Sequence, residues 1–109
     1  MLSHEEVEMY ILDLPDARLD YPFGEHVAVY KVQDKMFALL EEGKSPLRLS
    51  LKCDPQLALT LRQDYETVMP GYHLNKKHWN TIVLSGQLPW TEVQDLIRHS
   101  YDLVQGSRS

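Results

Sequence analysis

HVAVYKVQDKMFALLEEGKSPLRLSLK, residues 26–52, holds three apolar runs separated by short turns. Gln33–Asp34 reads as a two-residue turn, and 42–46 reads as a second hairpin loop. Connections this short join antiparallel strands, and an antiparallel sheet can place one face on a core and the other in water. We therefore predict an antiparallel meander of three strands: 26–32, 35–41 and 47–52.

Helical segments precede and follow this meander. Ser3 and Glu6 form a capping box for a helix over 4–14, and Asp54 with Pro55 is typical of the start of a second helix. Apolar residues at helical spacing predict a third helix over 88–104. With short extended segments at 67–71 and 80–86, the order becomes α-β-β-β-α-β-β-α. The sequence predicts one α+β domain over 1–109, with helices packed on a single antiparallel sheet of about five strands.

Composition limits the classes of protein that the chain can belong to. The 109 residues are 43% hydrophobic and 25% charged, as in a globular protein, and no apolar run is long enough for a membrane span. Cys53 is the one cysteine, so no internal disulfide forms, and an N-terminus without signal-peptide character favours the cytoplasm. We expect no membrane partner and favour a monomer.

The net charge of −5 is distributed unevenly along the chain. Ten acids and three bases give residues 1–42 a charge of −7, whereas six bases and three acids give residues 43–79 a charge of +3; the remainder carries −1. An acidic protein with this asymmetry can still present a local basic surface.

The densest polar stretch is HLNKKHWN, residues 73–80. Lysine and amide side chains can contact phosphates, and an exposed tryptophan can stack on an unpaired base. A polar turn explains the same residues, with the asparagines bonded locally to backbone amides and the tryptophan in the core, and we prefer that interpretation for both. For the two lysines, solvated charge and phosphate contact remain equally open. The candidates for nucleic-acid contact here are His73, Asn75, Lys76, Lys77, His78 and Trp79.

A second set of cations comes from the strand 47–52 and the loop before it. Leu47, Leu49 and Leu51 alternate with polar residues, which places Arg48 and Lys52 on one face with Ser50 between them. Lys44 lies in the preceding hairpin loop, which could act as a wing against a nucleic-acid backbone. A solvated sheet face, or lysines that prevent edge-to-edge strand pairing, is the alternative.

Four segments in this order resemble the MmcQ/YjbR family of small bacterial proteins: KMFALL, LSLKCDP, PGYHLNKKHWNTIVL and IRHSYDLV. The resemblance spans about residues 20–104, and LKCDP (51–55) and GYHLNKKHWN (71–80) are its most specific parts. It implies an α+β fold similar to the CyaY-like fold and to type III secretion chaperones. The family is commonly labelled DNA-binding, with a double-wing arrangement, so the resemblance implies DNA as a partner.

Catalytic and metal sites receive little support. Cys53 precedes a helix directly, which can activate a thiol, and His73 or His78 would then serve as the base; the neighbouring Asp54 opposes thiolate formation, and a buried free cysteine is the commoner case. Five residues separate the two histidines, which is wrong for one helical face, and no zinc motif, glycine-rich phosphate loop or nucleophile elbow occurs. We expect no enzyme, metal or cofactor.

A protein-interaction or chaperone-like module is the alternative function, by analogy of fold. Its apolar contact residues would be Trp90, Tyr101 or Leu103.

Overall fold

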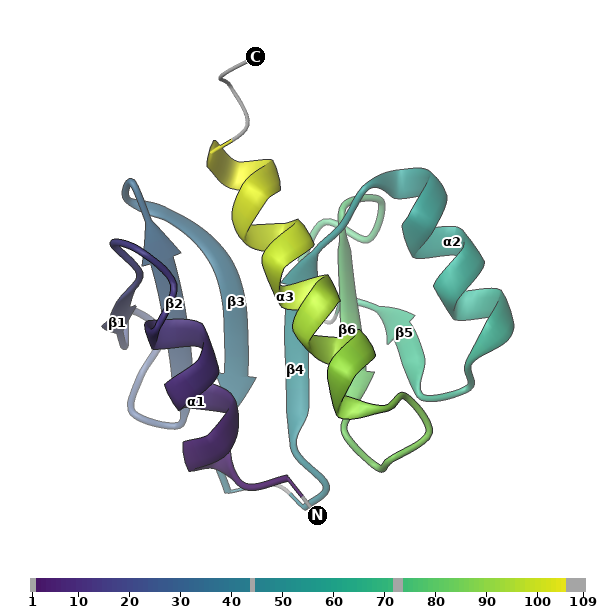
Figure 1. The fold of residues 1–109 in the computed structure, drawn as a ribbon, viewed down its shortest axis with the longest axis horizontal. Helices are drawn as coiled ribbons and strands as arrows, with labels where there is room; N and C mark the ends of the chain where they lie inside the picture. The colour runs from purple at the N-terminus through teal and green to yellow at the C-terminus, as the bar shows by residue number, and fades with distance from the viewer. Residues whose placement is uncertain (1, 44, 72–73, 106–109) are drawn as a thin grey trace.

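The structure, a computed structural model, describes residues 2–43, 45–71 and 74–105. Three helices and six strands follow one another along the chain (Figure 1). They are α1 (His4–Leu12), β1 (Arg18–Asp20), β2 (Val27–Val32), β3 (Lys35–Glu41), β4 (Arg48–Lys52), α2 (Pro55–Asp64), β5 (Val68–Pro70), β6 (Trp79–Val83) and α3 (Trp90–Gln105). The predicted α+β class and element order are confirmed.

The strands form one antiparallel sheet in the order β1-β2-β3-β4-β6-β5. The sheet has six strands instead of about five, because β1 adds an edge strand that we did not predict. All three residues of β1 are exposed, so its sequence carries no apolar alternation. The meander β2–β3–β4 has the predicted antiparallel connections, and Gln33 and Asp34 form its first turn with positive φ angles of 55° and 63°.

Local sequence explains where the first two helices begin. Ser3 Oγ accepts from the Glu6 amide while Glu6 Oε1 accepts from the Ser3 amide, so the predicted capping box is present. The Asp54 carboxylate accepts from the amides of Gln56 and Leu57, and Pro55 occupies the first position of α2.

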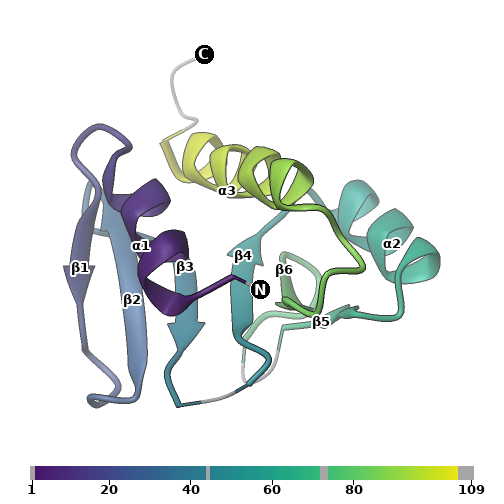
Figure 2. The same ribbon diagram turned by 60° about the horizontal axis from the view of Figure 1, so that its bottom comes forward.

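All three helices cover the same face of the sheet (Figure 2). Val7 and Ile11 of α1, and Val93 and Ile97 of α3, are fully buried against inward residues of β2, β3, β4 and β6. Ser100 joins α3 to two strands by hydrogen bonds: its hydroxyl donates to the Phe37 carbonyl of β3 at 2.5 Å and accepts from the Lys52 amide of β4 at 2.9 Å. The main core therefore lies between the sheet and its helical layer.

The opposite face, here called the helix-free face, has a smaller apolar cluster. Val29, Leu39 and Trp79 are buried there, and Leu74, from the segment before β6, packs against them. Beside the cluster, the hydroxyls of Ser50 and Thr81 lie 2.8 Å apart across β4 and β6 and are hydrogen-bonded. These side chains, with Leu74, thus shield part of this face from water.

Candidate nucleic-acid interface

Strand β4 carries the first predicted cations, and its register fixes where they lie. Arg48 pairs with Val83 and Lys52 pairs with Trp79, so both basic side chains belong to the helix-free face. They are four residues apart, which is about 13 Å along an extended strand. Arg48 and Lys52 thus share a face, as predicted, but lie at opposite ends of it.

The segment before β6 is held by its own polar groups. Asn75 Oδ1 accepts from the Lys77 amide at 2.9 Å, and the Asn75 carbonyl accepts from the His78 amide at 3.1 Å. The local-turn interpretation of Asn75 is confirmed. This turn leaves Lys76 and Lys77 exposed, whereas His78 is half-buried and its carbonyl accepts from the Cys53 amide at 2.7 Å.

Asn80 is structural as well, but not through the local bonds that we predicted. It is buried in β6, where its Oδ1 accepts from Arg62 Nε at 2.7 Å and its Nδ2 donates to the Ala58 carbonyl at 3.3 Å. Arg62 also donates through Nη2 to the carbonyls of Lys76 and Trp79. One arginine of α2 therefore fixes the turn that presents the two lysines.

Trp79 is 8% exposed and belongs to the apolar cluster of the helix-free face. The core interpretation is confirmed, and base stacking by this residue is ruled out because its ring faces Val29 and Leu39 and not water. The backbone at residue 71 can pass close to Trp79 because this residue is a glycine: a Cβ at Gly71 would lie 2.7 Å from Trp79 Cβ.

Register brings a further lysine, Lys35, to the end of the sheet where Lys52 lies. Lys35 starts β3 opposite Val32, beside the β2–β3 turn, and β4 ends and β6 begins at this end of the sheet, where Leu51 of β4 pairs with Ala38 of β3. Directly paired residues share a face, so Lys35, opposite the core residue Val32, lies on the helix-covered face, whereas Lys52, opposite Trp79, lies on the helix-free face. Within the described residues, none of these cationic side chains forms an ion pair. We call this set the lysine end: Lys35, Lys52, Lys76 and Lys77.

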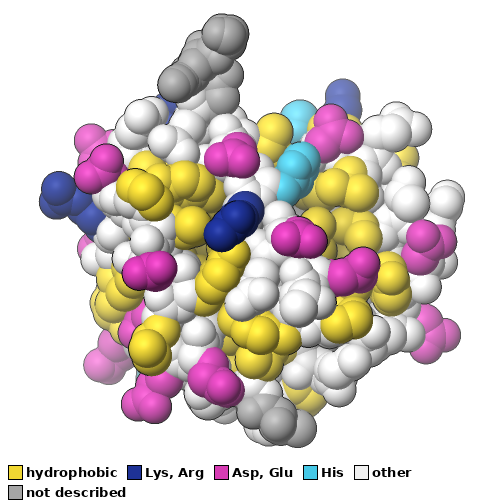
Figure 3. Space-filling model, viewed as in Figure 1, with side chains coloured by type: hydrophobic (Ala, Val, Ile, Leu, Met, Phe, Trp, Pro, Cys, Tyr) yellow, Lys and Arg dark blue, Asp and Glu magenta, His cyan; other side chains and the backbone are white. Residues whose placement is uncertain are grey.

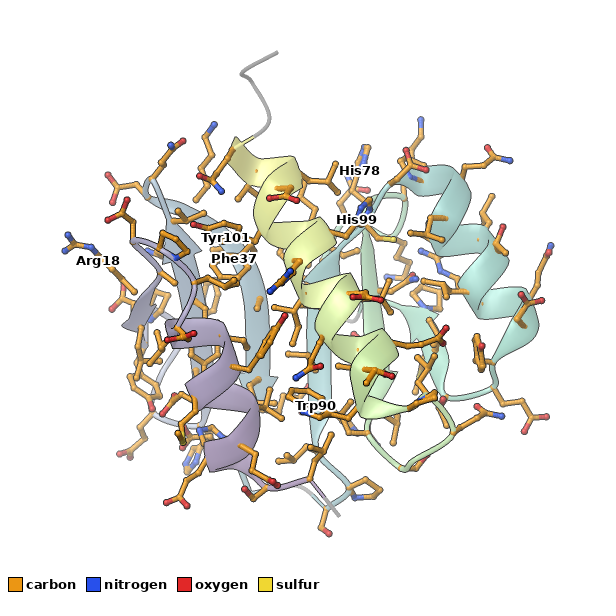
Figure 4. All side chains as sticks on the ribbon, viewed as in Figure 1. Arg18, Phe37, His78, Trp90, His99 and Tyr101 are labelled. Atoms are coloured by element: carbon orange, nitrogen blue, oxygen red, sulfur yellow. The ribbon has the colours of Figure 1, made fainter. Side chains whose placement is uncertain are left out.

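Two more cations, Lys31 and Arg18, lie near the lysine end, but the charge of Lys31 is offset by an ion pair. Lys31 forms an ion pair with Asp20 at 3.2 Å, and hydrogen bonds from Lys31 and from the Tyr21 amide hold the pKa of Asp20 below its usual value. Arg18 pairs in register with Lys31 and points away from the domain (Figure 4). Asp34, exposed in the turn beside Lys35, is the nearest opposing charge along the chain.

Some of the residues predicted to contact nucleic acid are not part of the lysine end. Arg48 is at the other end of β4, so its assignment to one continuous basic row is corrected. Lys44 and His73 lie outside the described residues. Sequence reasoning missed Lys35 because only the strand register shows which turn meets the end of β4.

The end of the sheet away from the lysine end is acidic. Glu42 accepts from the Tyr21 hydroxyl at 2.9 Å, and Glu8 accepts from the buried Tyr30 hydroxyl at 2.6 Å. His4 Nε2 lies 3.5 Å from Glu42 and 3.6 Å from Glu8. These carboxylates are held at the far end of β2 and β3 from the β2–β3 turn, so they do not neutralise the lysine end.

Cys53 is buried at 3% exposure, which confirms the apolar interpretation of this residue. Burial, followed by the charge of Asp54, raises the pKa of its thiol to about 11, so the thiol is protonated at neutral pH. In the parts of the chain that the structure describes, no three His, Cys, Asp or Glu side chains are grouped to hold a metal ion. None of the described helices has the length and apolar character needed to cross a bilayer.

The apolar residues predicted for a protein interface are mostly not free. Tyr101 is buried, stacks edge-on against Phe37 at 5.3 Å and donates its hydroxyl to the Pro15 carbonyl (Figure 4). Trp90 is half-buried beside Tyr10, with ring centroids 5.7 Å apart. Leu103, at 39% exposure, is the one of the three that faces water.

A family model named YjbR matches residues 12–103. The chain belongs to the YjbR family. It is 42% identical to YyaQ of Bacillus subtilis (strain 168), covering 96% of this chain and all of the relative, and 38% identical to YbdF of Escherichia coli O157:H7, covering 93% and 83%. Both relatives are uncharacterized, so this YjbR-family chain gains no activity from them.

Solved structures of similar proteins agree with the fold. Deinococcus radiodurans protein DR2400 is 38% identical and superposes with a TM-score of 0.93 over 98% of this chain and 81% of that one. A Pseudomonas syringae protein at 29% identity has a TM-score of 0.81 over 94% and 98% of the two chains. The family model and these superpositions thus each cover most of the chain.

Proposed function

We propose that this YjbR-family protein binds the phosphate backbone of duplex DNA through the lysine end. The observation that supports the proposal is the placement of Lys35, Lys52, Lys76 and Lys77 at one end of the sheet, with no ion pair among the described residues to neutralise them. Lysines carry compact charges and contact phosphate oxygens without reading bases. We therefore propose binding that depends little on sequence.

Charge separation within the domain makes such binding compatible with a net charge of −5. The seven residues of β3 span about 23 Å, so the carboxylates near Glu42 lie well beyond the Debye length of about 8 Å at physiological salt. Phosphates at the lysine end would interact mainly with the nearby lysines, against the exposed carboxylates of Asp34 and Asp54, and only weakly with the distant acids. Binding would be weak and strongly dependent on salt.

The proposed function is binding without catalysis. The protonated, buried thiol of Cys53 is unsuited to nucleophilic attack, and Trp79 is unavailable for stacking on unpaired bases. We place this function in the cytoplasm, where DNA is found and a single unpaired cysteine is ordinary.

The decisive experiment replaces the exposed lysines in pairs. Lys76→Ala with Lys77→Ala should weaken binding to duplexes of different sequence equally and flatten the salt dependence by about one unit of slope per lost contact. Lys52→Ala and its matched control Arg48→Ala each remove one positive charge from the helix-free face at opposite ends of β4, and only Lys52→Ala should weaken binding. Fluorescence anisotropy at two salt concentrations provides the measurement.

Two results would end the proposal. One is an absence of duplex binding by the unmodified protein at low salt. The other is an equal loss from Arg48→Ala and from Lys52→Ala, because general electrostatic attraction, and not the lysine end, would then explain the binding.

A further inference from the structure

A groove runs between α2 and α3, on the side of the molecule away from the helix-free face. Figure 3 shows apolar side chains gathered between these two helices, with carboxylates beside them. The groove has a volume of about 250 Å³ and is lined by Leu57, Leu61, Glu92, Asp95, Leu96 and His99. Its His99 end comes closest to the lysine end, through the bond from the Asp54 amide to His99, whereas its acidic end at Glu92 and Asp95 is remote from it and takes no part in the proposed DNA contact.

The floor of the groove is aliphatic and its helices are antiparallel. Leu57 and Leu61 are four residues apart on α2, and Leu96 faces them from α3. Tyr65, at the end of α2, donates to Glu92 near the start of α3 at 3.4 Å, whereas His99 Nε2 accepts from the Asp54 amide at the beginning of α2. The two helices therefore form walls that run side by side in opposite directions.

The charge of the groove has one sign. Glu92 and Asp95 line it, and among the described residues no lysine or arginine does. Asp64 ends α2 at the same end of the groove, and the partial charges of the α2 C-terminus and the α3 N-terminus, which meet there, offset each other, so the carboxylates set the sign of the charge. A cation is the complementary charge for this end.

Size and shape select the kind of occupant. A volume of about 250 Å³ is below the ~300–1,000 Å³ of pockets that enclose drug-sized ligands, but it accommodates two aliphatic side chains. The lining of α3 from Glu92 to His99 spans about 10 Å, or two helical turns. Leu57 and Leu61 are about 6 Å apart along α2, and two anchors at i and i+4 on a partner helix match that spacing, as in other helix-in-groove complexes.

We propose that the α2–α3 groove binds a basic amphipathic helix of a partner protein. Two aliphatic side chains of that helix occupy the space between Leu57, Leu61 and Leu96. Its lysines or arginines lie against Glu92 and Asp95 at the end of α2. This assignment gives the protein a second interaction surface that is independent of the DNA proposal.

A synthetic helical peptide of roughly 15 residues tests the proposal, with leucines at i and i+4 and lysines on either side. We expect saturable binding by fluorescence anisotropy at low salt. Amide chemical shifts should change along Leu57–Leu61 and Glu92–His99. Replacing the peptide's leucines by serine, or its lysines by glutamate, should abolish binding.

Protein variants separate the groove from general acidity. Asp95→Lys should weaken peptide binding about fivefold, the effect of roughly 1 kcal/mol. Asp13→Lys is the matched control, because it makes the same charge change at an exposed position after α1 and should leave peptide binding unchanged. Lys76→Ala with Lys77→Ala should also leave it unchanged, whatever that variant does to DNA.

Several outcomes would overturn the proposal. Equal binding of the serine peptide would show attraction by charge alone, and equal binding of the glutamate peptide would remove the charge complementarity. Equal effects of Asp95→Lys and Asp13→Lys, or shift changes away from α2 and α3, would place the contact elsewhere.

Discussion

Arg62 of α2 donates through Nε to Asn80 Oδ1 of β6 at 2.7 Å, and this contact joins the helical layer to the strand that follows the lysine turn. The same guanidinium reaches the carbonyls of Lys76 and Trp79. A group that lies between the helices and the sheet thus determines where two exposed cations are presented.

Arg62→Ala should lower the free energy of unfolding by about 1–3 kcal/mol, because it leaves the buried Oδ1 of Asn80 without its partner. Urea denaturation provides the measurement. Arg98→Ala, an exposed arginine of α3, is the control and should change stability by less than about 0.5 kcal/mol. Equal stability of the two variants would contradict a structural role for Arg62.

Ser100→Ala should be destabilising by a similar amount, about 1–3 kcal/mol. Its hydroxyl is fully buried and serves both the Phe37 carbonyl and the Lys52 amide, which lose their partner together. Amide hydrogen exchange at Lys52 should become faster in this variant. Protection of that amide at the level of the unmodified protein would show that the hydroxyl is replaceable.

Asp34→Asn should strengthen the proposed DNA binding, because it removes the acid next to Lys35 at the β2–β3 turn. We expect a two- to fivefold gain at low salt that shrinks as salt is added, in keeping with an exposed charge. Glu25→Asn, an exposed site just before the far end of β2, should have no effect. A gain from both changes would indicate net charge instead of a local surface.

Cys53 should make stability depend on alkaline pH. Burial and Asp54 raise its pKa in the folded protein to about 11, above the unfolded value near 9. The resulting stabilisation is complete below pH 9 and is lost as pH rises from 9 towards 11, because the unfolded chain then releases the proton first. Cys53→Ala should flatten this decline by roughly 1–3 kcal/mol, whatever it costs in packing.

Thiol alkylation gives an independent measurement for the same residue. Cys53 should react slowly with iodoacetamide at pH 8 in the folded protein and rapidly in urea. Burial limits access of the reagent to the thiol, and the raised pKa keeps the thiol protonated. Rapid reaction of the folded protein would show an accessible thiol and a pKa that is not raised.

The sequence was sufficient to predict the meander and the helices because each has a local pattern. Leu49 and Leu51 alternate with Ser50 in β4, and Ser3 and Asp54 cap their helices through bonds to the next few residues. Strand β1 has no such pattern: Arg18, Leu19 and Asp20 are all exposed, and it is a strand only because it pairs with β2.

The candidate site was harder to predict because it depends on register. The two-residue period correctly assigned Arg48 and Lys52 to one face, yet it carries no information on how far apart they lie along the strand. Lys35 joined the site because the β2–β3 turn and the end of β4 lie at the same end of the sheet, which only the strand pairing shows. The partner of Asn80 is Arg62, eighteen residues earlier, and no local turn rule would identify it.

The two tryptophans lie on opposite sides of one sheet: Trp79 in the cluster with Val29, Leu39 and Leu74, and Trp90 at the start of α3 among the helices. The molecule therefore contains two native optical probes in separate environments. Emission from a Trp90→Phe protein would report events on one side, and emission from a Trp79→Phe protein would report those on the other, without an attached dye.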